Sequence, residues 1–484
     1  MCPLTSYMKH PSTGSGRAPW VAAVTVSLAL MNTTVVSPSR TSAAARPEPF
    51  EGPTDGTLME KQVTRGPGGR ILTNTGVWSP DSRWLVYDTR SDVAGEGFDG
   101  TRIEMVHIDT GEVKVLYQSG RGAHCGVVTF HPHQSRVAFI LGPENPTPDW
   151  SYGVSHRQGV LAHADSPGTT ENLDARDLTP PFTPGALRGG THVHVWHPQG
   201  DWVSFTYNDA LLESELRDVG VSVPRPAVPV RKDHARNHDG QYFSVLVTHS
   251  TPTPKPGSDE IKRAFEEGWI GTNGYLRADG TRQARALAFQ GHVVTRDGQT
   301  VSEVFVVDLP EELTMAGDGP LAGTERQRPY PPRAVTQRRL TRTTERSYPG
   351  LQGPRHWLRS SPDGSRIAFL MKDEQGIVQL WTISPNGGSP TQVTRNPQPI
   401  ASCFTWSPDG KFIAHVLDGS VAITDVVAGT TRRLTPRRDE PIAPRPEACA
   451  FSPDQQRIAY VRRVPSEGRE ANQIFVVQVP ETLR

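Results

Sequence analysis

Histidine is the residue type whose spacing in this chain could do chemistry. His192 and His194 are separated by one residue, and such positions in a β-strand point to the same face. His124 and His356 occupy comparable places relative to a repeated motif. Neutral imidazoles bind divalent transition metals, so these four histidines are candidate ligands of one Mn, Fe, Ni or Zn ion. The alternative is that each imidazole hydrogen-bonds to backbone groups and has a structural role.

Three further residues are candidate ligand contacts. Asn74 and Glu447 stand four residues before a copy of the repeated motif, as His192 and His356 do. Arg355 lies beside His356 and is a candidate contact for an anion, because a guanidinium group binds carboxylates in a bidentate manner. All three are therefore expected near the histidines.

A repeated decapeptide must position these side chains. It contains an aromatic or small residue, Ser-Pro or His-Pro, a polar turn and an alternating apolar strand. Six copies begin at Trp78, Phe130, Trp196, Ser360, Trp406 and Phe451. Apart from one long gap, this spacing is typical of β-propeller blades, each made of four short strands. Since the first strand of a blade lines the central channel, residues just before each copy are expected to meet there.

The long gap between the copies at Trp196 and Ser360 must contain at least one more blade. Within it, residues 241–247, 284–290 and 301–309 alternate like strands but lack the Ser-Pro-Asp turn. The predicted fold is therefore an all-β propeller of seven blades, with six as the alternative. Residues 60–65 resemble the outer strands of other blades, so this N-terminal strand is expected to complete the last blade and remove its open edge.

The amino terminus predicts export. Residues 1–45 contain no Asp or Glu, and their apolar run, 20–31, is too short for a comfortable membrane span. Small residues at 43–45 suit signal peptidase, while an uncleaved anchor or a misassigned start codon is the alternative. The expected organisation is a signal peptide, a linker at 46–59 and one propeller domain at 60–484. The processed protein would be periplasmic or secreted, without an integral membrane span.

The region 251–271 reads as an insertion on a propeller face. A Pro-rich stretch leads into Ser258, a good N-cap, and Asp259 and Glu260 follow where a first helical turn would carry acidic residues. Gly268 can end such a helix. We expect a short helix at 258–268, the alternative being a surface loop with one helical turn.

Composition excludes several classes of protein. The 51 Lys and Arg residues balance the 51 Asp and Glu residues, and neither sign forms a long block, so no nucleic-acid partner is expected. The chain has no Gly-x-Ser-x-Gly elbow, phosphate loop or Cys-x-x-Cys pair. Polar and aromatic loops at 142–146 and 150–157 could form the rim of a sugar or peptide site, or only close hairpins. The expected partner is a protein or a glycan at the channel mouth.

The Ser-Pro-Asp-Gly blades resemble those of TolB-like periplasmic propellers. Longer motifs are shared with the YidR-like family over about residues 60–484, and the chain is identified as a member of it. The family is a domain of unknown function, so the resemblance implies the fold and no reaction. The motifs that carry it lie at 72–75, 122–124, 142–146, 187–194, 256–261 and 354–357.

A more distant similarity is to oligogalacturonate lyases, propeller enzymes in which histidines and a glutamine hold a divalent metal for β-elimination on uronides. The His192–His194 pair is similar to theirs, but Gly189 stands where their glutamine would be, and the blade order differs.

Two functions therefore stand, and whether the protein is an enzyme is left open. One is a ligand- or protein-binding module. The other is a metal-dependent lyase or hydrolase acting on acidic oligosaccharides. The enzyme requires the four histidines around one point, whereas a binding module tolerates them spread along the channel.

Overall fold

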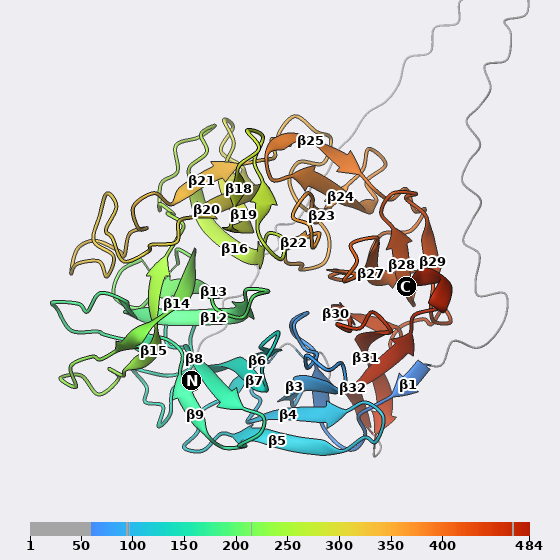
Figure 1. The fold of residues 1–484 in the computed structure, drawn as a ribbon, viewed down its shortest axis with the longest axis horizontal. Helices are drawn as coiled ribbons and strands as arrows, with labels where there is room; N and C mark the ends of the chain where they lie inside the picture. Colours follow the sequence, from blue (N-terminus) through green and yellow to red (C-terminus); the bar gives the residue numbers. More distant parts are fainter. Residues whose placement is uncertain (1–59, 93–94, 96, 214, 467–468) are drawn as a thin grey trace, which may run out of the picture. The chain divides into compact units, whose positions relative to one another are not determined.

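The computed structural model describes residues 60–92, 95, 97–213, 215–466 and 469–484. In this part of the chain, seven antiparallel four-stranded sheets surround a central channel, so the predicted seven-bladed propeller is confirmed (Figure 1). The proposed signal peptide and linker fall outside the described residues and stay predictions. None of the described residues forms a helix of the length and hydrophobicity needed to span a membrane.

The blades follow one another along the chain. Blade 1 comprises β2 (Gly69–Ile71), β3 (Trp84–Arg90), β4 (Arg102–His107) and β5 (Val113–Gln118). Blade 2 comprises β6 (Cys125–Phe130), β7 (Arg136–Leu141), β8 (Gln158–His163) and β9 (Thr170–Asn172). Blade 3 comprises β12 (Gly189–Trp196), β13 (Val203–Asp209), β14 (Asp218–Val228) and β15 (Gly240–Leu246). Blade 4 comprises β16 (Ile261–Trp269), β19 (Arg285–Val294), β20 (Thr300–Leu309) and β21 (Thr336–Arg339).

The remaining blades complete the ring. Blade 5 comprises β22 (Arg359–Ser360), β23 (Ile367–Lys372), β24 (Val378–Ser384) and β25 (Gly387–Gln392). Blade 6 comprises β26 (Thr405–Trp406), β27 (Phe412–Leu417), β28 (Ser420–Asp425) and β29 (Thr431–Arg433). Blade 7 comprises β30 (Pro444–Phe451), β31 (Arg457–Ser466), β32 (Arg469–Gln478) and β1 (Glu60–Gln62). Smaller elements are the pair β10 (Ala175–Arg176) and β11 (Ala186–Leu187), the pair β17 (Tyr275–Leu276) and β18 (Arg282–Gln283), and η1 (Glu481–Leu483).

The two ends of the propeller domain close the ring together, as predicted. β1 pairs with β32 in antiparallel register, and these strands lie side by side in Figure 1. The Glu60 carboxylate forms ion pairs with Arg462 and Arg438 and accepts a hydrogen bond from the Tyr460 hydroxyl. A strand from one terminus thus covers the edge of a sheet made by the other.

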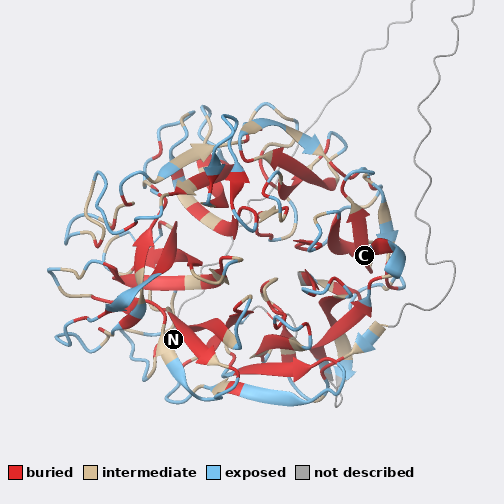
Figure 2. Ribbon diagram, viewed as in Figure 1, coloured by how far each residue is buried: buried red, intermediate tan, exposed pale blue. Residues whose placement is uncertain are grey.

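The repeated motif has an architectural role. In blade 1 the Ser79 hydroxyl donates to Asp81 (2.5 Å) and accepts from the Trp84 amide (2.9 Å), which holds the turn between the first two strands. The aromatic residue at the start of the motif lies between blades. In blade 6, for instance, the Trp406 indole donates to the Arg359 carbonyl of blade 5 (2.9 Å). Buried apolar clusters join neighbouring blades in the same way, and buried residues concentrate on the strands in Figure 2.

The predicted helix at 258–268 is wrong. Residues Ile261–Trp269 form β16, the innermost strand of blade 4, which pairs with β19. Ser258 does not cap a helix but closes a turn, donating to the Lys255 carbonyl (2.7 Å) and accepting from the Glu260 amide (3.2 Å). Pairing in the sheet outweighs the local helix propensity of this segment. Trp269 is the motif aromatic of this blade, because its indole donates to the Val195 carbonyl (3.0 Å) of blade 3.

Candidate functional site

The inner strands of three neighbouring blades carry a β-bulge at the same place. Val127, Val193 and Glu266 each stand three residues before the aromatic residue of their blade and have φ of 55°, 57° and 53°. The strand register shifts at each of these positions. A bulge inserts an unpaired residue, so side chains on its two sides no longer alternate in the regular way. Left-handed backbone at a non-glycine residue is also costly, and such positions gather at functional sites.

The bulge separates the two neighbouring histidines. His194 is completely buried, and its Nε2 is 3.0 Å from the hydroxyl of Thr191 on the same strand. Gly159 leaves it room, since a Cβ there would lie 2.6 Å from the same nitrogen. His192 instead lines a hollow that opens to solvent. Contrary to the prediction from the sequence, His192 and His194 do not point to the same face of the strand, because Val193 interrupts the alternation of side chains.

The other two histidines have structural contacts. The His356 Nε2 accepts a hydrogen bond from the Leu370 amide (3.1 Å), so its Nδ1 carries the proton and donates to the Pro354 carbonyl (2.9 Å). Burial lowers the pKa of His356 to about 4, which keeps this imidazole neutral. His124 is half-buried, with Nδ1 2.8 Å from the Phe98 carbonyl oxygen.

A shared metal ion does not fit this arrangement. Within the described ranges, no group of three or more His, Cys, Asp or Glu side chains is placed to hold one.

The three candidate ligand contacts, Asn74, Glu447 and Arg355, do not meet in one site either. Asn74 is buried and its Oδ1 accepts from the Thr75 amide (2.6 Å), while Glu447 forms an ion pair with Arg445 (2.7 Å). Arg355 lies in the same hollow as His192. Of the seven candidate residues, the structure brings these two together.

This hollow, which we call the arginine hollow, has a volume of about 390 Å³. Its residues come from one side of the ring: Arg157, Arg217 and Arg355 precede β8, β14 and β22, and His292 lies near the end of β19. That side is opposite to the Ser-Pro-Asp turns, which follow the first strands. Blades 2 to 5 supply the lining, which consists of Arg157, His192, Arg217, Arg263, Phe265, Glu266, His292 and Arg355.

Positive charge dominates the arginine hollow. Four guanidinium groups face a single carboxylate, Glu266, and that carboxylate already pairs with Arg355 (2.7 Å). Arg157 is only 7% exposed, and its side chain has no hydrogen bond or ion pair within the described residues. The Nε of Arg263 is likewise buried without a partner among them. Buried charges in proteins are normally paired, so this excess points to an anionic ligand.

The ionisation of the lining follows from burial and repulsion. Burial, together with the charges of Arg263 and Arg157, lowers the pKa of Arg217 to about 10. Burial and three neighbouring guanidinium groups hold the pKa of His192 well below its usual range. Burial and Arg263 lower the pKa of His292 to about 4. At neutral pH the arginines are charged and both imidazoles are neutral, and such perturbed groups in one cleft are typical of functional sites.

Most of this site is not visible in the sequence. Arg217 and Arg157 come from connections between second and third strands, and Arg263 and Phe265 come from the segment that was expected to be helical. The metal-ligand prediction for His192, the anion-contact prediction for Arg355 and the rim prediction for residues 150–157 each pointed to a part of it. Side chains from these four blades line one hollow only in the closed ring.

Fold and site together define a seven-bladed β-propeller with an arginine-lined hollow on one side of its channel. The chain belongs to the YidR family, as predicted: it is 48% identical over 410 residues to "Uncharacterized protein YidR" of Escherichia coli (strain K12), covering 83% of this chain and 94% of that protein. The family described as "Protein of unknown function (DUF3748)" matches residues 124–238.

Solved structures of oligogalacturonate lyases share the fold. An oligogalacturonate lyase in complex with manganese superposes with a TM-score of 0.51 and 10% identity, covering 90% of this chain and 96% of the lyase. TolB from Acinetobacter baumannii gives a TM-score of 0.34 and 14% identity, covering 85% of this chain and 79% of TolB. At these identities the likeness to the lyase shows the architecture alone.

Proposed function

We propose that this protein binds an acidic oligosaccharide, a sugar chain with uronate residues, in the arginine hollow. The observation that carries the proposal is the excess of guanidinium groups there, above all the buried and unpaired Arg157. Guanidinium groups bind carboxylates through two parallel hydrogen bonds, and such charge-assisted bonds are stronger than neutral ones. The likeness to a lyase named for oligogalacturonate favours uronates among carboxylated ligands.

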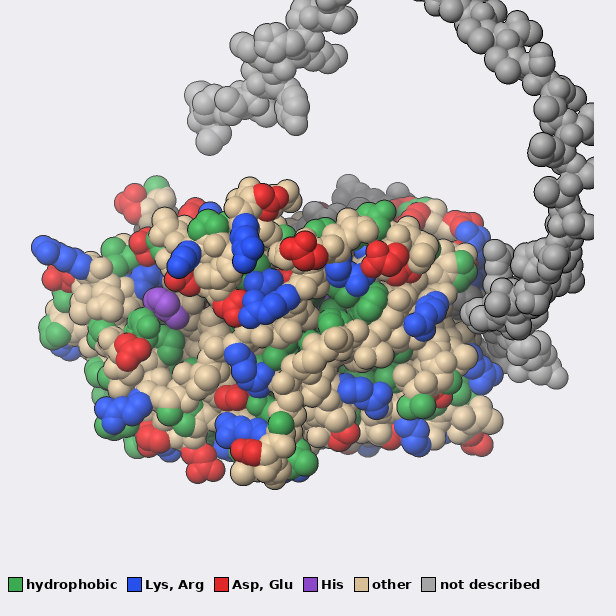
Figure 3. Space-filling model, turned by 90° about the horizontal axis from the view of Figure 1, so that it is seen from above, with side chains coloured by type: hydrophobic (Ala, Val, Ile, Leu, Met, Phe, Trp, Pro, Cys, Tyr) green, Lys and Arg blue, Asp and Glu red, His purple; other side chains and the backbone are tan. Residues whose placement is uncertain are grey.

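The charge distribution favours a small anion over a long polyanion. The whole chain has a formal net charge of zero, and basic and acidic side chains are interspersed on the side seen in Figure 3. The positive excess is therefore local to the hollow. Its volume of about 390 Å³ lies within the range of small-molecule sites, ~300 to 1,000 Å³.

Isothermal titration calorimetry with trigalacturonate, and with inorganic sulfate for comparison, tests the proposal. We expect the arginine hollow to bind trigalacturonate, and Arg157→Met and Arg217→Gln each to weaken it roughly 10- to 100-fold, because a hydrogen bond to a charged group contributes about 1.5–3 kcal/mol. Arg65→Gln is the matched control, since Arg65 is exposed and lies outside the hollow.

Three results would contradict uronate binding. They are the absence of binding, variants of the hollow that bind as well as the control, and inorganic sulfate binding more tightly than trigalacturonate. The last result would indicate a sulfated or phosphorylated ligand in place of a carboxylate.

A second candidate is uronide lyase activity, favoured by the neutral imidazole of His192 among the arginines. The arginines would neutralise the uronate carboxylate and make the adjacent C–H more acidic. His192 would take that proton as a carbon–carbon double bond forms and the C–O bond to the next sugar breaks. The leaving oxygen would gain a proton from water. Ultraviolet absorbance of the unsaturated product, with His192→Ala as the variant, checks this reaction; no absorbance change would refute it.

We also propose that the protein is exported. The acid-free, centrally apolar composition of residues 1–45 supports this. Cell fractionation with amino-terminal sequencing tests it, and a chain that stays in the cytoplasm with residues 1–45 intact would contradict it.

A further inference from the structure

A second and larger hollow, of about 810 Å³, lies between blades 3 and 4. We call it the outer hollow. One wall is the connection from β15 to β16, which includes His249, Asp259 and Glu260. The other wall is the long connection 310–335 between β20 and β21. Long connections in compact domains are uncommon and are often functional.

The two blades beside the outer hollow differ from blades 5 and 7. In blades 5 and 7 an outer-strand threonine hydrogen-bonds to a glutamine on the third strand, Thr394 to Gln379 (2.7 Å) and Thr64 to Gln473 (2.8 Å). Blades 3 and 4 have an acid in place of this glutamine. The acids are Asp218 and Glu303, and their threonine partners are Thr248 and Thr341.

Each of these acids binds an arginine that helps to build the outer hollow. Arg328, from the connection 310–335, pairs with Asp218 (2.7 Å) and donates to the Ser250 hydroxyl (3.2 Å). The same connection is held a second time by the fully buried Arg188, which pairs with Asp209 and donates to the Thr324 carbonyl. One buried ion pair and one hydrogen bond from a buried arginine thus fasten this wall to blade 3.

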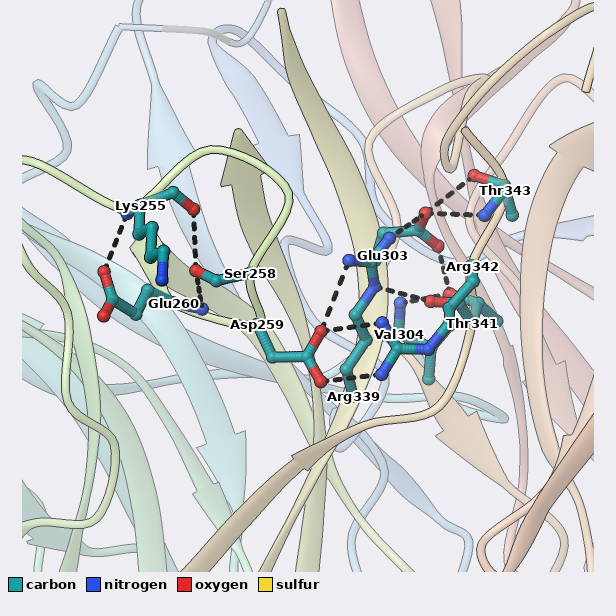
Figure 4. Close-up of polar contacts among 10 residues, drawn as sticks. All are labelled: Lys255, Ser258, Asp259, Glu260, Glu303, Val304, Arg339, Thr341, Arg342 and Thr343. Atoms are coloured by element: carbon teal, nitrogen blue, oxygen red, sulfur yellow. Dashed lines mark hydrogen bonds and ion pairs between the residues drawn. The ribbon is translucent and has the colours of Figure 1, made fainter. Parts of the chain in front are cut away.

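The opposite wall is fixed by the network in Figure 4. Arg339 pairs with Glu303 (2.9 Å) and reaches Asp259 (3.5 Å), and Arg342 binds both oxygens of Asp259 (2.8 and 2.7 Å). The Lys255 amide donates to one oxygen of Glu260 (2.7 Å). Both walls are therefore in place before a ligand arrives, which reduces the entropy cost of binding.

The lining combines an aromatic surface with unpaired polar groups. The rings of His249 and Tyr330 lie 4.6 Å apart, next to Pro331 and Pro332. The side chains of Asp318 and Arg333, and the Tyr330 hydroxyl, also belong to the outer hollow. They have no hydrogen bond or ion pair with any residue that the structure describes. The outer hollow thus offers hydrogen-bond donors and acceptors and charged groups of both signs. The arginine hollow, by contrast, is mainly positive.

We propose that the outer hollow is a second binding site, for a neutral oligosaccharide. Sugar rings present C–H faces that pack on aromatic rings, and hydroxyl groups that donate and accept hydrogen bonds. The outer hollow offers both kinds of contact, and Arg339 and Arg342 neutralise the Asp259 carboxylate in its wall. This site does not depend on uronate binding in the arginine hollow.

Saturation-transfer NMR and calorimetry with four neutral trisaccharides test this site. The probes are maltotriose, cellotriose, chitotriose and mannotriose. We expect at least one to bind, Tyr330→Ala to weaken that binding tenfold or more, and Asp318→Asn to weaken it severalfold. Tyr348→Ala is the matched control, because Tyr348 lies in the connection between β21 and β22 and does not line the outer hollow. The thermal unfolding midpoint of every variant is measured alongside.

The outcomes separate the two sites. Neutral sugar binding that is lost in Tyr330→Ala, while trigalacturonate binding is kept, supports the outer hollow whether or not the arginine hollow binds uronates. If none of the four trisaccharides binds, the proposal is wrong. So does binding that Tyr330→Ala and Asp318→Asn leave unchanged.

Discussion

Replacing Arg157 by Met should stabilise the free protein and impair ligand binding at once. The side chain is 7% exposed, faces three other guanidinium groups and has no anionic partner within the described residues. Met keeps most of the apolar volume of the side chain but removes its charge. A residue with a purely structural role would instead lose stability when replaced.

The magnitude follows from Coulomb's law. Two like charges about 8 Å apart repel by ~2 kcal/mol at an effective dielectric constant of ~20. Arg157 also lies 5.5 Å from the ring centroid of Tyr152, a cation–π contact that contributes ~0.5–1 kcal/mol and is lost in the variant. The free energy of unfolding should therefore rise by ~1 kcal/mol. For a chain of this size, that corresponds to a midpoint increase of ~1–2 °C.

Differential scanning calorimetry with and without trigalacturonate measures both effects. Ligand should raise the midpoint of the wild-type protein and of Arg65→Met, because it binds only the folded state. It should have little effect on Arg157→Met. A lower midpoint for free Arg157→Met, or a full ligand-induced increase in this variant, would refute the argument from charge repulsion.

Three further predictions concern pH, ring closure and metal. Burial lowers the folded pKa of His356 and His292 to about 4, below ~6.5 in the unfolded chain. Between these two values the unfolded state therefore binds more protons than the folded state. As the pH drops from ~6.5 to ~4, the free energy of unfolding should fall by up to ~1.4 kcal/mol per pH unit for each histidine. Urea unfolding at several pH values measures this, and a free energy of unfolding that does not change with pH would contradict it. Deleting residues 1–62 exposes the edge of β32 and removes the ion pairs of Glu60, so soluble yield and thermal midpoint should fall, whereas deleting residues 1–45 should change neither. Treatment with EDTA should leave the affinity for trigalacturonate within twofold, since the arginines bind the carboxylate directly; a tenfold loss in calorimetry would show that a metal ion takes part.

The propeller could be predicted because its signals are local and repeated. The turn at Ser79 uses the same hydrogen bonds as the turns at Ser361, Ser407 and Ser452. Six copies of one motif make the blade period visible even though blade 4 lacks it. The closing strand was predicted because residues 60–65 share the pattern of the other outer strands.

The errors arose where tertiary contacts outweigh local preference. The segment around Ser258 has good helix signals, yet pairing with β19 makes the following residues a strand. Val193 is β-branched, and nothing in its local sequence predicts φ of 57°. That single residue turns His194 away from the hollow lined by His192.

The class of fold, the number of blades and the closure of the ring could be predicted from the sequence, which also singled out His192 and Arg355 as candidate site residues. These follow from spacing, turn chemistry and residue type, which act over a few neighbouring positions. Arg157, Arg217 and Arg263 join His192 and Arg355 only through the packing of blades 2 to 5. These residues lie far apart along the chain. Their guanidinium groups create one region of positive potential only when four blades are packed around the same axis.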